Sequence, residues 1–344
     1  MLLRIGVYLC LVVWASSAAP AQPVGKAESG PKPAKGAKTS VQIPRAGIKT
    51  PGVQIPFANL KSEAEFAVVP QWIAFTDAPL LADDHGLYKI DAKKNELGKP
   101  VATLNKPCGG IVNAFTSLWI PACADHALLR IDPKTWKTTA TVSSGTGTAK
   151  PALAATADSI WLLSDDKTSL SRIDPEQNAV VAEIRLPAGC NTVTFGETAL
   201  WVTCPAEDRV LRIDPDKNLV DKRIEVSAQP KALAIGEGSI WVLCQKDGKV
   251  ERIDPKTNKV IKTIELAVPG AEGTIAVNPG SIWVSQAGFP LTRIDPATDK
   301  VVQQFWGAGG GSMHFGVNSV WLGNLPDGKV WRVDPKRVIA TLAE

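Results

Sequence analysis

A repeat of about 40 residues runs along most of this 344-residue chain and constrains its fold more than any other feature. Each copy pairs a tryptophan in an apolar run, such as Ser239-Ile-Trp-Val-Leu-Cys, with a downstream Arg-Ile-Asp-Pro tetrapeptide. Successive tryptophans are 47, 42, 40, 40, 42 and 38 residues apart, and they are Trp72, Trp119, Trp161, Trp201, Trp241, Trp283 and Trp321. The tetrapeptides begin, after a degenerate Lys89-Ile-Asp-Ala, at Arg130, Arg172, Arg212, Arg252, Arg293 and Arg332 (where Val replaces Ile). A period in this range is typical of a repeat architecture.

Each repeat divides into four segments of strand length separated by turn-forming residues. In the fifth repeat the segments are 231–235, 239–243, 249–253 and 259–266. Four short strands in a unit of about 40–45 residues suit one propeller blade. The sequence therefore predicts an all-β fold, a seven-bladed β-propeller of four-stranded antiparallel blades over residues 61–344.

The repeated residues have structural roles in this interpretation. Asp-Pro opens the turn between the third and fourth strands, because Asp bonds the backbone ahead of it and Pro presets φ. The tryptophan of the second strand fills the space between blades and bonds a carbonyl through its N–H. The arginine is expected to pair with an acidic group or to lie on the outer surface. The last repeat ends in residues 336–344, which we expect to form its own fourth strand; exchange of one strand between the chain ends is the alternative.

The first 60 residues differ from the repeats in composition. Residues 1–21 have the features of a signal peptide: Arg4, an apolar run from Ile5 to Ala15, and Ala19-Pro-Ala before the cleavage point. The apolar run is too short for a transmembrane helix, which needs roughly 20 residues. Residues 22–60 are rich in Pro and Lys, which predicts an extended basic tether, with one of two segments, Val41-Gln-Ile-Pro or Val53-Gln-Ile-Pro, placed along an edge of the propeller. We expect a secreted or periplasmic protein, and a monomer.

The basic charge belongs to this leading segment. The whole chain has a net charge of +4, whereas residues 61–344 carry 31 basic and 33 acidic side chains, a net charge of −2. A near-neutral body gives no general attraction to nucleic acid. The tether has no aromatic residues between its lysines for base stacking, so we expect no nucleic-acid partner.

Five cysteines follow the signal peptide. Cys108 and Cys190 each stand 11 residues before their tryptophan, while Cys123 and Cys204 stand four and three residues after theirs. First and second strands are antiparallel neighbours, so we predict the bridges Cys108–Cys123 and Cys190–Cys204 in an oxidising compartment. A Cys204–Cys244 bridge between blades is the competing assignment.

The starts of the first strands and the turns between second and third strands lie on one face, called the channel face here. Such mouths commonly hold small-molecule sites. The polar residues expected to line a site there are Asn191, Lys231, Thr274, Ser285, Gln286, Ser312, His314 and Asn324. His314 is interpreted as a hydrogen-bonded core residue or a channel ligand. A cation site formed by His85 and His126 with nearby acidic loops is a second possibility; its acidic residues are Asp83, Asp165, Asp166, Glu207 and Asp208.

Repeats of the form Gly-x-x-Ser-Ile-Trp-Val followed by Arg-Ile-Asp-Pro-x-Thr-x-Lys-Val resemble bacterial YVTN-type propellers and the streptogramin (virginiamycin B) lyase-like group. The resemblance covers residues 61–344 and implies the propeller fold. The group includes exported proteins of unknown ligand and metal-dependent lyases that linearise a cyclic depsipeptide lactone. Those lyases carry His near the start of the first strand and Glu about three residues after the tryptophan.

This chain departs from the lyase pattern at both positions. The early position holds Cys108, Lys150, Cys190, Pro230, Glu272 and Gly310, and the late position holds Phe75, Ala122, Ser164, Cys204, Cys244, Gln286 and Asn324. No His occupies the first set and no Glu the second, so the general acid–base and metal groups do not carry over. The sequence predicts a non-catalytic propeller that binds a small molecule or protein at its channel face, without cofactor or metal. A metal-dependent lyase or lactonase-like hydrolase is the alternative.

Overall fold

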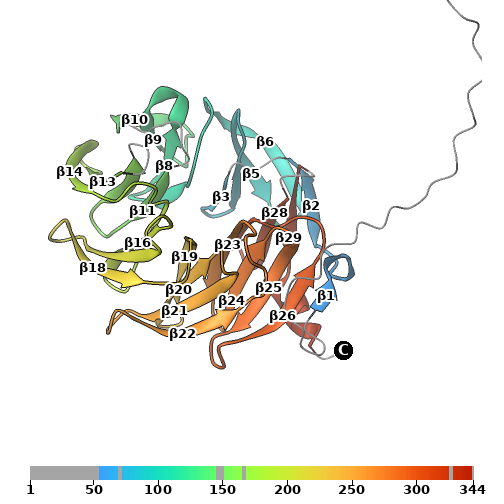
Figure 1. Cartoon of the computed structure of the whole chain (residues 1–344). Coiled ribbons are helices and arrows are strands. Elements are labelled where there is room, and N and C mark those ends of the chain that lie inside the picture. The colour runs from blue at the N-terminus through green and yellow to red at the C-terminus, as the bar shows by residue number, and fades with distance from the viewer. Residues whose placement is uncertain (1–53, 69–71, 145–150, 165–167, 325–327, 343–344) are drawn as a thin grey trace, which may run out of the picture. The chain divides into compact units, whose positions relative to one another are not determined.

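The computed structural model describes residues 54–68, 72–144, 151–164, 168–324 and 328–342. Seven sheets lie in a ring, with the first strand of each blade nearest the axis, as Figure 1 shows. Blades one to three comprise, from the inner strand outward, β3 Trp72–Phe75, β4 Pro79–Ala82, β5 Gly86–Asp91 and β6 Glu96–Thr103; β7 Val112–Ala114, β8 Ser117–Ala122, β9 Ala127–Ile131 and β10 Thr138–Ser143; β11 Ala152–Ala155, β12 Ile160–Ser164, β13 Ser169–Asp174 and β14 Ala179–Arg185.

The remaining blades follow the same order. They comprise β15 Thr192–Gly196, β16 Ala199–Cys204, β17 Arg209–Asp214 and β18 Leu219–Glu225; β19 Pro230–Gly236, β20 Ser239–Cys244, β21 Lys249–Asp254 and β22 Lys259–Glu265; β23 Gly273–Asn278, β24 Ser281–Gln286, β25 Phe289–Asp295 and β26 Lys300–Trp306; β27 Ser312–Gly316, β28 Ser319–Asn324 and β29 Lys329–Val333. The predicted all-β, seven-bladed propeller is confirmed. Among the described residues, no helix is long and apolar enough to cross a membrane.

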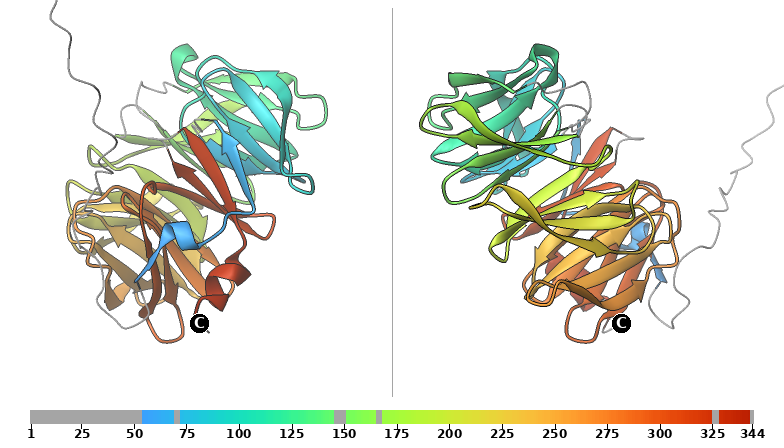
Figure 2. Two further views of the ribbon diagram at one scale, coloured as in Figure 1. Left: turned by 90° about the vertical axis from the view of Figure 1, so that its right-hand side faces the viewer. Right: turned by 60° about the vertical axis from the view of Figure 1, so that its left-hand side comes forward.

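Blade seven corrects the predicted closure of the ring. Its fourth strand is β2 (Ala64–Ala67), which pairs antiparallel with β29. The C-terminal segment instead forms the helix α1 (Pro335–Ala340), because Asp334 caps its N-terminus by accepting a hydrogen bond from the Lys336 N–H at 2.8 Å. Phe66 of β2 is buried against Trp321, with ring centroids 5.9 Å apart. The exchanged strand β2 therefore closes the ring by pairing with the third strand of blade seven (Figure 2).

A second N-terminal segment extends blade six. β1 (Gln54–Pro56) pairs parallel with β26, at the outer edge of the sheet. This is the Val53-Gln-Ile-Pro segment, and the edge position predicted for one of the two such segments is confirmed. Phe57, in the 3₁₀ turn η1 (Phe57–Asn59), then packs on Trp331 of blade seven with ring centroids 5.1 Å apart. Residues 1–53, with the predicted signal peptide and most of the predicted tether, lie outside the described residues.

Blade one corrects the predicted register of the first repeat. Trp72 lies on the inner strand β3, where it pairs with Ala82, and is not on the second strand. The second strand β4 places Leu80 opposite Lys89, as Trp161 lies opposite Arg172 in blade three. Leu80 is thus the true equivalent of the repeated tryptophan, and it is fully buried.

The six other repeated tryptophans are fully buried between blades. Each indole N–H donates to the residue five positions upstream: four bind a carbonyl, as Trp201 binds Gly196 at 3.0 Å, while Trp161 and Trp283 bind side-chain oxygens. Each apolar cluster joins the facing sides of two neighbouring blades, so the core is a series of inter-blade layers. Burial of this kind is the main stabilising term of the fold.

The repeated arginine connects each blade to the next. In blade five, the Arg252 guanidinium lies 4.8 Å from the Trp241 ring, and its Nε donates to Ser239 Oγ at 2.8 Å. Its Nη1 reaches blade six, where it donates to the Pro296 carbonyl at 3.0 Å and to Asp299 at 2.9 Å. Equivalent contacts to the next blade are made by Arg130, Arg172 and Arg332. We call this set of contacts the arginine latch.

The Asp of each Asp-Pro turn has the predicted role. Asp254 Oδ1, for example, accepts the backbone N–H of Lys256 at 2.9 Å, and the same bond recurs at Asp91, Asp132, Asp174, Asp214 and Asp295. At Asp254 the backbone N–H of Lys256 and the Thr257 hydroxyl hold the carboxyl pKa below its ordinary value. These turns and the turns between first and second strands share the face opposite the channel face, called the Asp-Pro face here.

Candidate functional site

Two disulfides brace the channel face. The structure forms Cys108–Cys123 in blade two and Cys190–Cys204 in blade four, the pairings predicted from strand register. Cys244 is a free, buried thiol, so the competing Cys204–Cys244 bridge is absent from the described residues. Each bridge ties the start of an inner strand to the end of the second strand of the same blade.

The inner strands place one residue per blade at a common level near the channel face. This position lies two residues before the one that pairs with the repeated tryptophan, or with Leu80 in blade one. Its occupants, in blade order, are Trp72, Gly110, Ala152, Thr192, Ala232, Thr274 and Ser312. The scaffold residues repeat from blade to blade, whereas the residue type at this position changes. We call these seven residues the inner ring.

Trp72 is the large member of the inner ring. The His314 ring of blade seven meets it edge-on, with centroids 4.7 Å apart. On its other side, a Cβ at Gly110 of blade two would lie 3.4 Å from the Trp72 indole. Trp72 therefore extends from blade seven to blade two, and it remains half-buried. Trp72 is not among the predicted site residues, because the repeat pattern had placed it on a second strand.

His314 replaces a small residue on the inner strand. It pairs with Trp321, in the position that Ala276 has opposite Trp283 in blade six. Burial lowers the pKa of its imidazole to about 4, because the charged ring loses hydration there. The ring is therefore neutral at pH 7 and contacts Trp72 as an aromatic partner.

Four predicted residues gather where blades six and seven meet. Thr274 pairs with Ser285 across β23 and β24, and Ser285 Oγ accepts the Gly311 N–H of the linker to blade seven at 3.1 Å. Ser312 follows that linker directly on β27. Gln286 is fully buried, and its side chain donates to the Val268 carbonyl at 3.1 Å. Thr274 Oγ1 and Gln286 Oε1 are enclosed but have no hydrogen-bond partner among the described residues.

The other predicted residues lie apart from this group. Asn191 of blade four accepts a hydrogen bond from Thr203 at 2.7 Å, and Lys231 lies at a bulge of β19 in blade five. The Lys231 carbonyl accepts the Thr192 hydroxyl at 3.0 Å, which joins these two blades. Asn324 ends β28, where its backbone pairs with Lys329; its side chain is outside the described set. The eight residues thus form two groups on adjacent parts of the inner ring.

The acidic loops form turns and do not converge. Asp83 Oδ1 accepts the backbone N–H groups of His85 and Gly86, at 2.8 and 2.9 Å. His85 and His126 are both exposed in neighbouring turns. Asp165 and Asp166 lie outside the described residues. Within the described ranges, no group of three or more His, Cys, Asp or Glu side chains is arranged to hold a metal ion.

Carboxylates near Cys244 hold the linker between blades four and five. Three consecutive backbone N–H groups, from Ser227 to Gln229, donate to carboxylates at 3.1, 2.9 and 2.8 Å; the acceptors are Glu251, Asp247 and Asp208. Burial and the neighbouring Glu251 raise the pKa of the Cys244 thiol well above its ordinary range. Cys244 is therefore a protonated core residue and a poor nucleophile.

The channel face combines an aromatic surface, enclosed oxygen acceptors and a neutral imidazole. Hydrogen-bond acceptors and an indole ring can position a planar ligand that carries N–H or O–H groups. General acid–base catalysis is most efficient when the pKa of the group lies near the operating pH, and the His314 pKa of about 4 lies well below neutrality. The arrangement is suited to binding.

The comparisons with known proteins agree with the fold. No protein-family model matches the chain, and no curated protein matches its sequence. A streptogramin B lyase structure shares the fold with a TM-score of 0.65 and 15% identity, over 80% of this chain and 97% of that one. Virginiamycin B lyase from Staphylococcus aureus gives a TM-score of 0.63 at 15% identity, over 78% of this chain and 98% of that one. The Pan2 WD40 domain of Neurospora crassa gives 0.64 at 11% identity, over 79% and 95%.

The similarity to the lyases establishes a streptogramin lyase-like propeller fold, which was predicted from the repeats. Identity of 15% or less in these matches shows the fold alone. A WD40 domain matches about as well as the lyases, so the fold does not choose between a catalytic and a binding role. Function has to be argued from the residues of the inner ring.

Proposed function

We propose that the protein is an exported propeller that binds a small planar ligand at its channel face without transforming it. The ligand stacks on Trp72 and donates hydrogen bonds to the oxygens of Thr274 and Gln286. The observation that supports this most is the divergence of the inner ring: three neighbouring blades place Thr274, Ser312 and Trp72 at one level while their scaffold positions repeat.

The enclosed acceptors support the same proposal. A buried oxygen without a partner destabilises a fold by about 1–3 kcal/mol. Thr274 Oγ1 and Gln286 Oε1 are in this state, on the strands next to blade seven. A donor from a ligand or from water would satisfy them. Export is supported by the two disulfides, which persist in oxidising compartments.

Ligand-observed NMR with the secreted chain and a panel of aromatic and heteroaromatic compounds tests this proposal, followed by calorimetry on the hits. Trp72→Leu and Thr274→Val should each weaken binding by about 2- to 12-fold, because a ring contact or a hydrogen bond contributes about 0.5–1.5 kcal/mol. Trp306→Leu is the matched control, since Trp306 is exposed on the outer strand of blade six. If neither inner-ring substitution changes the affinity of the ligands, the proposed site is contradicted.

The same preparation tests the catalytic alternative. Cyclic depsipeptide lactones are incubated with the protein, and ring opening is followed by mass spectrometry with and without a chelator. Binding without turnover is the expected result. Chelator-sensitive turnover that His314→Ala abolishes would replace the binding proposal by the lyase alternative.

A further inference from the structure

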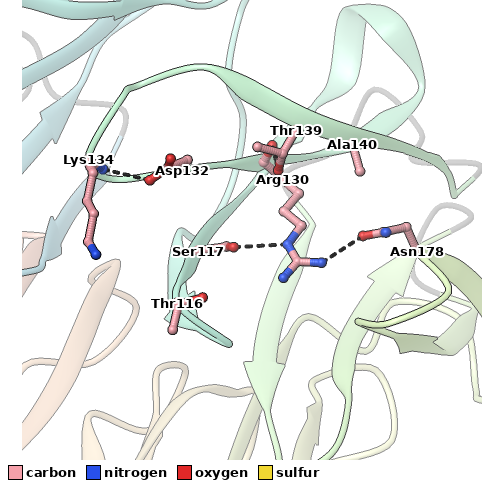
Figure 3. A pocket seen from close by; sticks show the side chains of 8 residues that line it. All are labelled: Thr116, Ser117, Arg130, Asp132, Lys134, Thr139, Ala140 and Asn178. Atoms are coloured by element: carbon pink, nitrogen blue, oxygen red, sulfur yellow. Dashed lines mark hydrogen bonds between the residues drawn. The ribbon is translucent and has the colours of Figure 1, made fainter.

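A cavity on the Asp-Pro face, between blades two and three, is separate from the proposed channel-face site. Its volume is about 380 Å³, and it is lined by Thr116, Ser117, Arg130, Asp132, Lys134, Thr139, Ala140 and Asn178. In Figure 3 the side chains of Lys134 and Arg130 descend on either side of the Thr116–Ser117 turn. The volume falls in the range of small-molecule pockets, about 300–1,000 Å³.

Arg130 differs in its charge environment from four of the five other repeated arginines; Arg293 of blade six likewise has no ion pair among the described residues, and it bonds Ser281 and Gln303 of its own blade. Arg172, Arg212, Arg252 and Arg332 each form an ion pair with a carboxylate. Arg130 bonds only neutral oxygens: those of Ser117 at 2.9 Å, Asn178 at 3.1 Å, and the carbonyls of Pro175 and Phe115 at 2.6 and 3.3 Å. These bonds use four of the five N–H donors of a guanidinium and leave one on Nη2. Its positive charge is not neutralised by any side chain in the described ranges.

The departure from the repeat is at position 116. Blade three has Asp158 three residues before its tryptophan, and Asp158 pairs with Arg172 at 2.7 Å. Blade two has Thr116 at the same place, where its hydroxyl donates to the Phe115 carbonyl at 2.7 Å. The carboxylate that neutralises the latch in blade three is thus missing beside Arg130.

Lys134 adds a second positive charge to the same cavity. Its side chain is exposed and forms no ion pair with the described residues. The one acidic lining residue, Asp132, is committed to its turn, where it accepts the Lys134 N–H at 2.8 Å and the Thr135 hydroxyl at 2.9 Å. The lining side chains therefore carry a net charge of +1, from two cations and one anion.

We propose that this cavity binds a small oxyanion, either a carboxylate or a phosphate, between Arg130 and Lys134. The free N–H of Arg130 and the Lys134 ammonium are charged donors, which form stronger hydrogen bonds to oxyanions than neutral groups do. The ligand takes the place that Asp158 occupies beside Arg172 in blade three. This site lies on the face opposite the inner ring and is independent of the ligand proposed there.

Calorimetric titration of the full secreted chain with citrate and with inorganic phosphate, at low ionic strength, tests the proposal. One saturable site per chain is expected for at least one of the two probes, and comparing them separates carboxylate from phosphate chemistry. Thr116→Asp supplies the missing carboxylate and should weaken binding about tenfold or more, through direct repulsion and neutralisation of Arg130. Thr116→Asn, similar in size but uncharged, should bind as the parent chain does.

Both substitutions suit the backbone, because Thr116 has a φ of 55°, a conformation that Asn and Asp tolerate better than Thr. Their melting temperatures should therefore be at least that of the parent chain. Lys134→Gln should also weaken binding, whereas Lys256→Gln should not, since that lysine has the same turn position in blade five, where Arg252 pairs with Asp299. Absence of binding to both probes, or equal affinity in Thr116→Asp and Thr116→Asn, would overturn the proposal.

Discussion

Arg212 of blade four makes no arginine latch to blade five, and its contacts give a quantitative prediction. Five of the repeated arginines donate Nε to a serine two residues before the tryptophan, at 2.7–2.9 Å. Blade four has Ala199 at that place. Arg212 Nε is buried without a partner, and so is Oδ1 of Asn258, the group in blade five that a latch would bond. Arg212 instead pairs with Asp221 of its own blade.

Ala199→Ser should restore the latch and stabilise the propeller. The new hydroxyl accepts from a charged donor, which contributes about 1.5–3 kcal/mol, and Arg212 regains its stacking on Trp201, about 0.5–1 kcal/mol. Loss of the half-buried Arg212–Asp221 pair offsets up to about 1 kcal/mol of this. The net gain is about 1–4 kcal/mol, or roughly 2–7 °C in Tm for a domain of this size at an unfolding entropy of about 2.1 cal/mol/K per residue.

Differential scanning calorimetry measures the effect, with Ser239→Ala as the reciprocal change. That substitution removes the Nε acceptor of Arg252 in blade five and should cost about 1–3 kcal/mol. If Ala199→Ser leaves the stability unchanged while Ser239→Ala lowers it, the reasoning is refuted, because Asp221 then sets the position of Arg212. Asp221→Asn then distinguishes the two causes, since it should restore the effect of the serine.

Three further predictions follow from the same contacts. Phe66→Ala should destabilise the protein by about 3–5 kcal/mol in denaturant titrations, because it removes a buried ring from the exchanged strand. The control Glu65→Ala changes an exposed side chain on the same strand and should destabilise the protein by under about 1 kcal/mol. Reducing a disulfide should cost about 3 kcal/mol for closed segments of 15 and 14 residues, seen as a lower Tm with reductant; an unchanged Tm with both thiols free contradicts this. The pKa of His314 is about 4 in the folded state and 6.5 in the unfolded state, so the unfolded state binds the proton more readily as the pH falls. The contribution of His314 to the free energy of unfolding is therefore fully present above pH 6.5 and falls by up to about 1.4 kcal/mol per pH unit between pH 6.5 and 4. His314→Gln should remove this part of the pH dependence of unfolding.

The repeats were sufficient to predict the blades because their signals are local. Trp, Asp-Pro and the intervening turn residues act within one unit, and the in-blade disulfides follow from the antiparallel register of adjacent strands. The register of blade one was misassigned because Trp72 was taken as the repeated tryptophan. The spacing of 47 residues to Trp119, outside the 38–42 of the other copies, was the available signal; Leu80 restores it to 39.

Ring closure depended on contacts that leave no local pattern. The strand Ala64–Ala67 has four residues and pairs with Lys329–Arg332, near the opposite end of the chain. The final Asp334-Pro335 resembles the other turns in sequence, but it begins a helix because no fourth strand follows it. Likewise, the latch joins residues 43–48 positions apart in successive blades, so its partners emerge only from the packing of one blade on the next.

Departures from the repeat change the contacts that a blade makes, and two of them leave a polar or charged group without a partner that other blades supply. Ala199 leaves Arg212 Nε without its acceptor, Leu80 replaces the repeated tryptophan in a blade whose Trp72 lies on the inner ring, and Thr116 leaves Arg130 without a carboxylate. A repeated scaffold satisfies its own polar groups blade by blade, so a charge or acceptor left over at one blade is available to something outside the repeat. The two faces differ in the groups that lack a partner within the repeat. The channel face has oxygen acceptors beside an indole, and the Asp-Pro face has cationic donors. Two ligands of different chemistry, one on each face, are therefore expected of this propeller.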